Sequence, residues 1–427
     1  MKFSFRNHPV TRSVLYLLCW TVFALITGAA GGLIGGLFGR AIQAVTGLRT
    51  AAPWILYLLP FIGAAIALLY KACHEEKNRG TNAVLSAIAG DVSVTVPTGP
   101  LIFLSTVLSH LGGASVGREG AALQLGGWLG ERFSGLMRFS PKDKRIAVMC
   151  GMSAVFAALF GTPVAAAIFC IEVARVGVFH YAALVPCIFS AFTGAGIASL
   201  LGLEAEVYQI ASVPELSAGN LLLTALLGLL CALLSILLVM TFHGFEKTGR
   251  RFLPNPYLRA FVCGGLIVGL TLLFGTTAYS GAGANLIELA LEGEAGSFSF
   301  ILKLLFTVLA IAGGFKGGEI VPTLSIGACF GALFGSLTGL PVSISAACGM
   351  IAVFAGATNC PIASLMIAME MFRGQGLPFF AVTVALSFVL SGYYSLYGSQ
   401  RFAFSKIGQE KPAPQQQEAA APQQAEH

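Results

Sequence analysis

The sequence predicts an all-α, polytopic membrane protein made of two homologous halves, and three observations support this. The first is composition, because 56% of the 427 residues are hydrophobic and only 10% are charged, whereas a soluble domain carries about 25% charged residues. The second is a series of apolar segments that Gly and Pro interrupt repeatedly. The third is an internal repeat that places the same polar residues in both halves of the chain.

The first apolar segment, residues 14–39, is too long for the hydrophobic region of a signal peptide, and no polar cleavage region follows it. We therefore expect it to be the first membrane span. Glycines recur in it at every fourth position, a spacing that lets two helices approach backbone to backbone. The two glycine series are Gly28, Gly32 and Gly36, and Gly31, Gly35 and Gly39.

The later apolar segments have uneven lengths. Several are too short to cross a bilayer, which takes about 20 residues, and residues 146–173 are too many for one straight helix. Short, interrupted hydrophobic segments are typical of transporters whose helices break near the membrane midplane. The segments are 53–70, 97–111, 121–137, 146–173, 181–203, 221–242, 261–274, 300–313, 321–337, 342–371 and 377–396.

The polar residues suit a membrane protein with no nucleic-acid partner. The net charge of +6 is modest, and its concentration in the N-terminus and short loops indicates positive-inside anchoring. We expect residues 1–11 to be cytoplasmic and residues 409–427, which are rich in Pro, Gln and Ala, to be disordered. The ten cysteines are scattered without metal-site spacing. We therefore expect them to be small core residues, and we expect no metal or cofactor.

The internal repeat aligns residues 150–175 with residues 348–373 without a gap, at an offset of 198, and eleven of the 26 positions are identical. Chance similarity between apolar segments would match Ala or Val. It would not keep a proline, a glutamate and an arginine in register. These pairs are Pro163/Pro361, Glu172/Glu370 and Arg175/Arg373.

A second pairing lies upstream of each copy, where Glu119 and Glu319 both follow a glycine-containing turn at an offset of 200. We therefore divide the chain into membrane repeats at 12–210 and 215–405. In membrane transporters, paired halves with interrupted helices place the substrate site at their interface, near the midplane.

Glu119 is the first candidate for a functional residue. It follows a glycine-rich turn at the start of an apolar helix, where free N–H groups and the helix dipole form an anion site. Its carboxylate can occupy that site in place of a transported anion, and protonation would free the site. The alternative is a simple helix cap, but an ionisable residue inside a membrane segment indicates function.

Three other glutamates have weaker signals. Glu319 lies at the corresponding helix start of the second half, so that two carboxylates could face one ion path, and the alternative is again a cap. Glu172 and Glu370 precede Arg175 and Arg373 by three residues, which predicts ion pairs that end each helix.

The segment Gly113-Ala114-Ser115-Val116-Gly117 formally matches GxSxG. A serine hydrolase would need a strand–turn–helix elbow and partnered His and acidic residues. No strand-like run precedes the turn, and His110 is the nearest histidine, so an intramembrane serine hydrolase is a remote alternative. A non-transporting scaffold or receptor is a third class.

Gly117-Arg118-Glu119-Gly120, followed by an apolar helix that contains Gln124, resembles the gating-glutamate motif of the CLC family of anion channels and proton-coupled anion antiporters. The resemblance covers about residues 12–405. It implies two halves inverted in the membrane, a homodimer with one pore in each subunit, and a multi-pass location in the cell membrane with both termini cytoplasmic.

The resemblance also implies an anion held by the N-termini of broken helices and by a tyrosine near the C-terminal end. The matching tyrosine is Tyr397, with Tyr394 as the alternative, and a phenol O–H can donate to an anion. The anion-binding positions that the resemblance implies are Thr81, Asn82, Gly120, Ile320, Val321 and Tyr397.

Two departures from the chloride-selective pattern favour the branch that exchanges fluoride for protons. Residues 80–84 read Gly-Thr-Asn-Ala-Val where chloride-selective members read Gly-Ser-Gly-Ile-Pro, and residues 318–322 carry the extra Glu319. Val173 stands where chloride/proton antiporters carry an internal proton-transfer glutamate. We therefore predict fluoride export in exchange for protons, with a chloride channel or chloride/proton antiporter as the alternative.

Overall fold

The computed structural model describes residues 9–408. Residues 1–8 of the expected cytoplasmic N-terminus and the expected disordered tail at 409–427 lie outside the described residues. The described part is mostly helical, as predicted. Eight helices of the first half recur in the same order in the second, so that α1–α8 correspond to α9–α16.

The first half contains α1 (Pro9–Ala51), η1 (Pro53–Leu58), α2 (Leu59–Ala72), α3 (Thr81–Ala89), α4 (Thr98–Gly112), α5 (Glu119–Leu136), α6 (Pro141–Phe160), α7 (Pro163–Glu172), β1 (Arg175–Val176), η2 (Tyr181–Ala183) and α8 (Leu184–Leu200). The second half contains α9 (Ala218–Phe252), α10 (Pro256–Phe274), α11 (Ala284–Glu292), α12 (Ser299–Gly313), α13 (Ile320–Thr338), α14 (Val342–Thr358), α15 (Pro361–Met371), α16 (Leu377–Leu390) and β2 (Arg401–Phe402).

Many of the apolar helices are too short to cross a bilayer alone, which confirms the prediction of broken helices. Six helical segments within the described residues are long and apolar enough to span it, whereas six other apolar helices have only 10–17 residues. The long run at 146–173 breaks where predicted. Gly161 ends α6 with a φ of 71°, a left-handed conformation that suits glycine, and Pro163 then begins α7.

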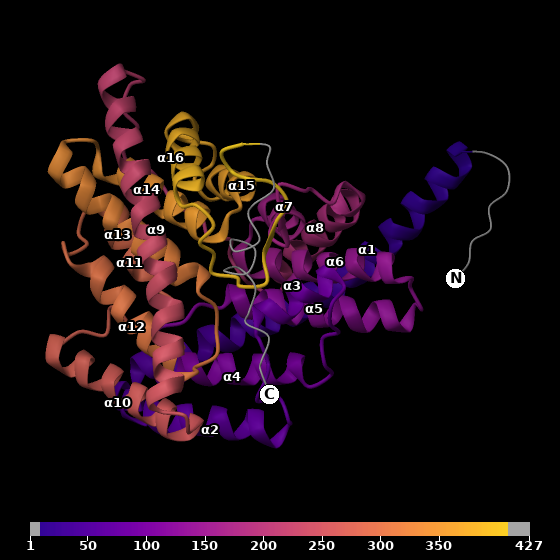
Figure 1. Ribbon diagram of the computed structural model, residues 1–427, viewed down its shortest axis with the longest axis horizontal. Coiled ribbons are helices and arrows are strands. Elements are labelled where there is room, and N and C mark those ends of the chain that lie inside the picture. The colour runs from indigo at the N-terminus through magenta and orange to yellow at the C-terminus, as the bar shows by residue number, and fades with distance from the viewer. Residues whose placement is uncertain (1–8, 409–427) are drawn as a thin grey trace.

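The two glycine series of α1 pack against different helices. A Cβ added at Gly28 or Gly32 would lie within 2.7 Å of a backbone carbonyl oxygen of α8, at Ser190 or Gly194. A Cβ added at Gly31 would instead lie 2.6 Å from Ala154 of α6. The predicted close helix contacts are therefore present, and they fix the long diagonal helix α1 against the first half (Figure 1).

The halves are joined at two backbone pairings. Gly117 and Gly318 form an antiparallel bridge, in which each N–H donates to the other's carbonyl at 2.6 and 2.7 Å. The C-terminal segment crosses back from α16 so that β2 pairs in parallel with β1 of the first half (Figure 1). Segments far apart in the sequence therefore meet at the centre of the molecule.

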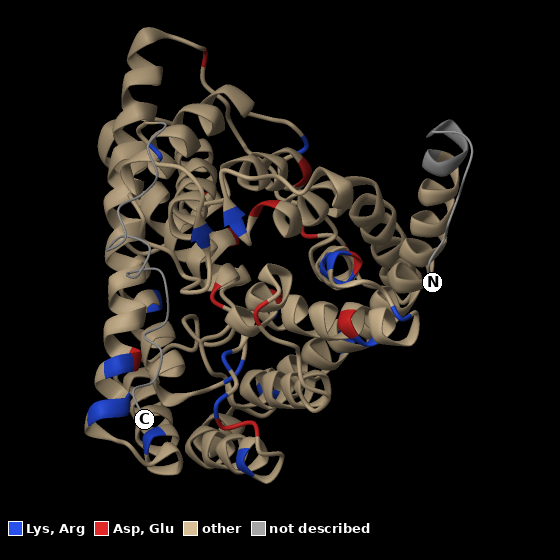
Figure 2. Ribbon diagram, turned by 45° about the vertical axis from the view of Figure 1, so that its right-hand side comes forward, with Lys and Arg blue, Asp and Glu red and all other residues tan. Residues whose placement is uncertain are grey.

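Charged residues are sparse on the helices and gather near the ends of some of them (Figure 2). A cluster of basic residues lies at the end of α9 and the start of α10. It consists of Lys247, Arg250 and Arg251 in α9 and Arg259 in α10. The cysteines are free thiols, and eight of the ten are buried, as expected of small core residues.

Candidate anion site

Glu119 is the first residue of α5 and is fully buried. One carboxylate oxygen accepts from the backbone N–H of Arg118 at 3.0 Å, and the other lies 3.3 Å from the Arg118 Nε. Arg118 also pairs with Glu206 at 2.6 Å and donates to the Leu159 carbonyl at 3.0 Å. The carboxylate is thus held at the N-terminus of its helix by the residue before it, between the two halves.

The start of α13 differs from the start of α5. The helices begin at Glu119 and Ile320, and the bridged glycines are Gly117 and Gly318, so the two segments correspond at an offset of 201. The predicted pairing at an offset of 200 is therefore wrong by one residue. Glu319 is the counterpart of Arg118, and the two carboxylates leave the backbone from non-equivalent positions.

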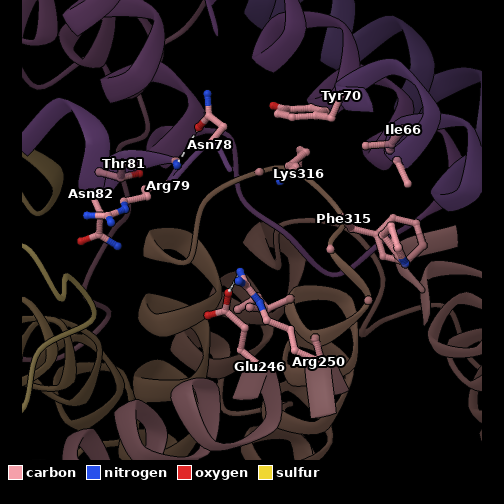
Figure 3. Close-up of a pocket in the computed structure, with 18 of the residues that line it drawn as sticks. Ile66, Tyr70, Asn78, Arg79, Thr81, Asn82, Glu246, Arg250, Phe315 and Lys316 are labelled. Carbon is pink, nitrogen blue, oxygen red and sulfur yellow. Dashed lines mark hydrogen bonds and ion pairs between the residues drawn. The ribbon is translucent and has the colours of Figure 1, made fainter. Parts of the chain in front are cut away.

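A cavity of about 510 Å³ enters the molecule between α2, α3, α9 and the segment before α13 (Figure 3). Glu319 is one of the residues that line it. Its carboxylate makes no hydrogen bond to another described residue, and it does not cap α13 with its side chain. The capping alternative therefore does not fit Glu319, because a cap requires such a bond.

Tyr397 lines the same cavity, whereas Tyr394 does not. The Tyr397 side chain is 2% exposed, and its hydroxyl has no hydrogen-bond partner within the described chain. A buried phenol normally finds a partner. Its unused donor is therefore available to a ligand in the cavity.

Thr81 and Asn82, the first two residues of α3, also line the cavity. The side-chain amide oxygen of Asn82 accepts from the backbone N–H of Ser399 at 3.0 Å, so this side chain ties α3 to the turn that carries Tyr397. Thr81 lies 3.4 Å from the Gly120 carbonyl. No side chain caps α3, which follows Gly80 at a φ of 60°.

The remaining predicted residues are buried beside the cavity without lining it. The Gly120 carbonyl accepts from Gln124 at 3.3 Å, and both Thr81 and Gln124 line the cavity. Ile320 and Val321 form the first turn of α13, where no side chain caps the backbone. The N-termini of α3 and α13 and the Tyr397 hydroxyl thus converge, and helix N-termini are anion sites.

Cationic side chains are more numerous than acidic ones along the cavity. Its lysines and arginines are Lys71, Arg79, Arg250, Arg259 and Lys316, and its acids are Glu76, Glu246 and Glu319. Arg250 pairs with Glu246 at 2.6 Å, and the Lys316 ammonium lies 4.4 Å from the centroid of the Tyr70 ring (Figure 3). The remaining positive charge favours an anion in the cavity.

Glu172 and Glu370 do not form the predicted ion pairs with Arg175 and Arg373. Glu172 accepts from the backbone N–H groups of Ile362 and Ala363 at 3.2 and 2.8 Å, at the start of α15. Glu370 accepts from Val164 and Ala165 at 3.0 and 2.8 Å, at the start of α7. Each carboxylate thus caps the corresponding helix of the other half.

Ser115 belongs to a buried hydrogen-bonded cluster with Lys303 and Thr307, which the sequence did not predict. The Lys303 ammonium donates to the Ser115 hydroxyl at 2.9 Å and to the carbonyls of Tyr279 and Gly281 at 3.2 and 2.7 Å. Ser115 also pairs with Thr307 at 2.8 Å. Ser115 and Lys303 are both 0% exposed, and neither of them lines the cavity that holds Glu319 and Tyr397. In the sequence, this cluster was indicated only by Lys303, which is the one charged residue of the apolar segment 300–313.

The comparisons with known proteins agree with this architecture. A profile described as voltage gated chloride channel matches residues 62–392. A chloride/fluoride channel protein of Pseudomonas syringae pv. tomato is 32% identical over 409 residues, which cover 94% of this chain and 90% of that protein. An H(+)/Cl(-) exchange transporter of Cronobacter sakazakii is 27% identical and covers 86% of each chain.

Two solved structures share the fold. A CLC-type fluoride/proton antiporter superposes with a TM-score of 0.87 at 31% identity, over 91% of this chain and 98% of that one. A slow cyanobacterial chloride/proton antiporter gives a TM-score of 0.75 at 19% identity, over 87% and 94% of the two chains. The chain is therefore a polytopic membrane transporter or channel rather than an enzyme, and it belongs to the voltage gated chloride channel (CLC) family.

Proposed function

We propose that this protein exports fluoride from the cell in exchange for protons. The observation that carries the proposal is the convergence on one cavity of the Tyr397 hydroxyl, the N-termini of α3 and α13, and the Glu319 carboxylate. Within the described part of the chain, none of these groups is hydrogen-bonded to another side chain. A small, strongly hydrated anion needs such donors to replace its water. Similarity to a fluoride/proton antiporter across most of both chains supports the choice of ion.

In this proposal the anion is held by backbone and side-chain donors around the inner end of the cavity. The backbone N–H groups of Ile320 and Val321, the hydroxyls of Thr81 and Tyr397, and the Asn82 amide would donate to it, with Gly120 packed behind. Glu119 would act as the gate, because its carboxylate lies at a helix N-terminus where an anion can replace it. Protonation of Glu119 would free that position and move one proton.

Glu319 would make the site selective and proton-dependent. Its carboxylate lines the cavity that holds Tyr397 and makes no hydrogen bond to another described residue. A fixed negative charge beside an anion path is unfavourable, so the anion would enter when Glu319 is protonated. Fluoride and protons would then share one path. The proposal needs a shared path because this chain has Val173 where chloride/proton antiporters carry their internal proton-transfer glutamate.

We infer the orientation from the charges and the assembly from the family. The basic residues that line the cavity lie next to membrane spans, and the positive-inside rule assigns such residues to the cytoplasm. We therefore propose that the cavity opens to the cytoplasm, that both termini are cytoplasmic, and that the protein is a lipid-embedded homodimer in the bacterial inner membrane. The repeat boundaries at 12–210 and 215–405 are part of this proposal.

The second candidate is a chloride channel or chloride/proton antiporter, and the 27% identity to a chloride/proton exchange transporter favours it. Flux measurements distinguish the two. Purified protein in liposomes is given a fluoride or a chloride gradient while an internal dye reports pH. We expect fluoride efflux with proton influx and much slower chloride flux. Equal rates for the two halides would reject fluoride selectivity, and absence of halide flux would favour a scaffold.

A further inference from the structure

A buried polar cluster lies behind Tyr397, and neither the family motif nor the proposed mechanism uses it. Its centre is Gln400, which is 1% exposed. We propose that Gln400 is the positioning residue for the Tyr397 hydroxyl and thereby sets the affinity of the anion site. This inference rests on the proposed role of Tyr397 as an anion ligand.

Gln400 closes the turn that carries Tyr397. The backbone N–H of Tyr397 donates to the Ser395 hydroxyl oxygen at 3.0 Å, and the Ser395 hydroxyl donates to the side-chain oxygen of Gln400 at 2.8 Å. The backbone N–H of Gln400 donates to the Tyr397 carbonyl at 3.0 Å. The backbone of Tyr397 is therefore tied to Gln400 on both sides.

The same side chain fastens this turn to both halves. The Gln400 amide nitrogen donates to the Val173 carbonyl at 2.9 Å, just after α7, and to the Thr358 carbonyl at 2.8 Å, the last residue of α14. Helix ends leave such carbonyls without partners inside the helix. The Asn359 amide nitrogen donates to the Gln400 oxygen at 3.1 Å, and the Lys406 ammonium donates to the Asn359 oxygen at 2.5 Å.

The Gln400 side chain thus makes four bonds, with Ser395, Asn359, Val173 and Thr358. They use the full capacity of a glutamine amide, which is two donors and two acceptor positions. They also fix its orientation, because a reversed amide would place its oxygen against two carbonyls. The Tyr397 hydroxyl, in contrast, has no partner within the described chain. Its position is therefore set by the backbone of its turn and by packing. A shift of that turn would move the hydroxyl directly, and hydrogen bonds weaken steeply with distance and angle.

The test compares four proteins in the fluoride flux assay: wild type, Tyr397→Phe, Gln400→Leu and the double variant. Tyr397→Phe should raise KM for fluoride about tenfold, the effect of losing one hydrogen bond to a charged group. Gln400→Leu should raise KM several-fold while kcat stays within about twofold. The double variant should match Tyr397→Phe alone, because positioning has no effect without the hydroxyl.

Ser395→Ala keeps the proposal testable if Gln400→Leu does not fold. It breaks the link to the Tyr397 N–H and leaves the Gln400 bonds to α7 and α14 in place, and it should also raise KM. Thr383→Val is the matched control, because this buried hydroxyl bonds within its own helix to Phe379 and Phe380. It should lower Tm without changing KM.

The outcomes separate this inference from the proposed function. If wild type moves fluoride and Tyr397→Phe raises KM, but Gln400→Leu and Ser395→Ala only lower Tm, Gln400 is structural and the inference is overturned. Additive effects in the double variant, or an unchanged KM in Tyr397→Phe, also overturn it. If wild type moves chloride instead, the proposed function fails, and the same comparison with chloride decides the role of Gln400.

Discussion

Glu119 and Glu319 follow the two bridged glycines, Gly117 and Gly318, yet their surroundings differ. Glu119 is fully buried and bonded to Arg118, whereas Glu319 lines the cavity without a hydrogen bond to another described residue. The one-residue difference in register between the halves produces this contrast. In the proposed function, the buried carboxylate is the gate and the cavity carboxylate controls anion entry.

Replacing the gate carboxylate should uncouple the two ions. In Glu119→Gln, the side chain keeps its shape but can neither carry a proton nor occupy an anion position as a charge. We expect fluoride flux to persist while proton movement is lost, as measured by pH-sensitive dye in liposomes under a fluoride gradient. Proton movement at the wild-type ratio would remove Glu119 from the gating role.

Replacing Glu319 should impair transport without unfolding the protein. Because its carboxylate makes no hydrogen bond to another described residue, Glu319→Gln removes no cap, and Tm should stay within a few degrees of wild type. We expect fluoride turnover to fall at least tenfold in the same assay, because glutamine is neutral like the protonated acid but cannot take up and release the proton that the proposed exchange cycle moves along this path. Normal flux would mean that Glu319 only neutralises nearby lysines and arginines.

Ser115→Ala tests the hydrolase alternative at the same scale. The change removes one of three acceptors from the buried Lys303 ammonium, which should cost about 1–3 kcal/mol of stability. We expect a lower Tm and continued fluoride flux, because Ser115 supports the loop before Glu119 and meets no substrate. Complete loss of flux in a stable variant would show that transport depends on the hydrogen bond between Lys303 and Ser115.

At the scale of the elements, helix ends are the places where the two halves recognise each other. The starts of α7 and α15 are each capped by a glutamate from the opposite half, and α3 is tied through Asn82 to the C-terminal turn. Capping by a distant carboxylate fixes the helix end in space, which a cap from its own helix cannot do.

These crossed caps make a prediction about stability. Glu172→Gln leaves one carbonyl oxygen to accept from two buried N–H groups and removes the charge that favours the start of α15. It should cost about 1–2 kcal/mol, visible as a lower Tm in detergent, and Glu370→Gln should behave alike. Glu292→Gln is the control, because Glu292 is exposed. No difference from that control would mean that water caps these helices equally well.

At the scale of the molecule, the close approach of Gly117, Gly120 and Gly318 joins the halves. A Cβ at Gly318 would lie 2.3 Å from the Gly120 nitrogen and 2.7 Å from its Cα, and backbone atoms cannot move aside. Gly318→Ala should therefore abolish monodisperse protein or fluoride flux. Gly265→Ala is the matched control, since apart from its chain neighbours and the backbone of its own helix nothing lies within 4 Å of its added Cβ. A functional Gly318→Ala protein would show that the halves can separate slightly.

Much of this architecture was predictable because Gly and Pro mark helix breaks locally. The break at Gly161–Pro163, the glycine faces of α1 and the repeat all appear in the sequence. The register that pairs the segment around Glu119 with the segment around Glu319 was not predictable. The gapless alignment of residues 150–175 gives an offset of 198, whereas the segments near Glu119 correspond at an offset of 201. The crossed caps and the Gln400 bonds depend on contacts between distant segments, which local patterns do not encode.

The crossed caps also bear on how such a chain could have arisen. Glu172 contacts the helix that carries Glu370, and Glu370 contacts the helix that carries Glu172, which is the reciprocal pattern of an interface between identical subunits related by a two-fold axis. A polypeptide of half this length, inserted in both orientations, could make the same contacts with a second copy of itself. The covalent link between α8 and α9 would then have allowed the two copies to diverge, so that one kept the buried glutamate and the other gained the glutamate in the cavity.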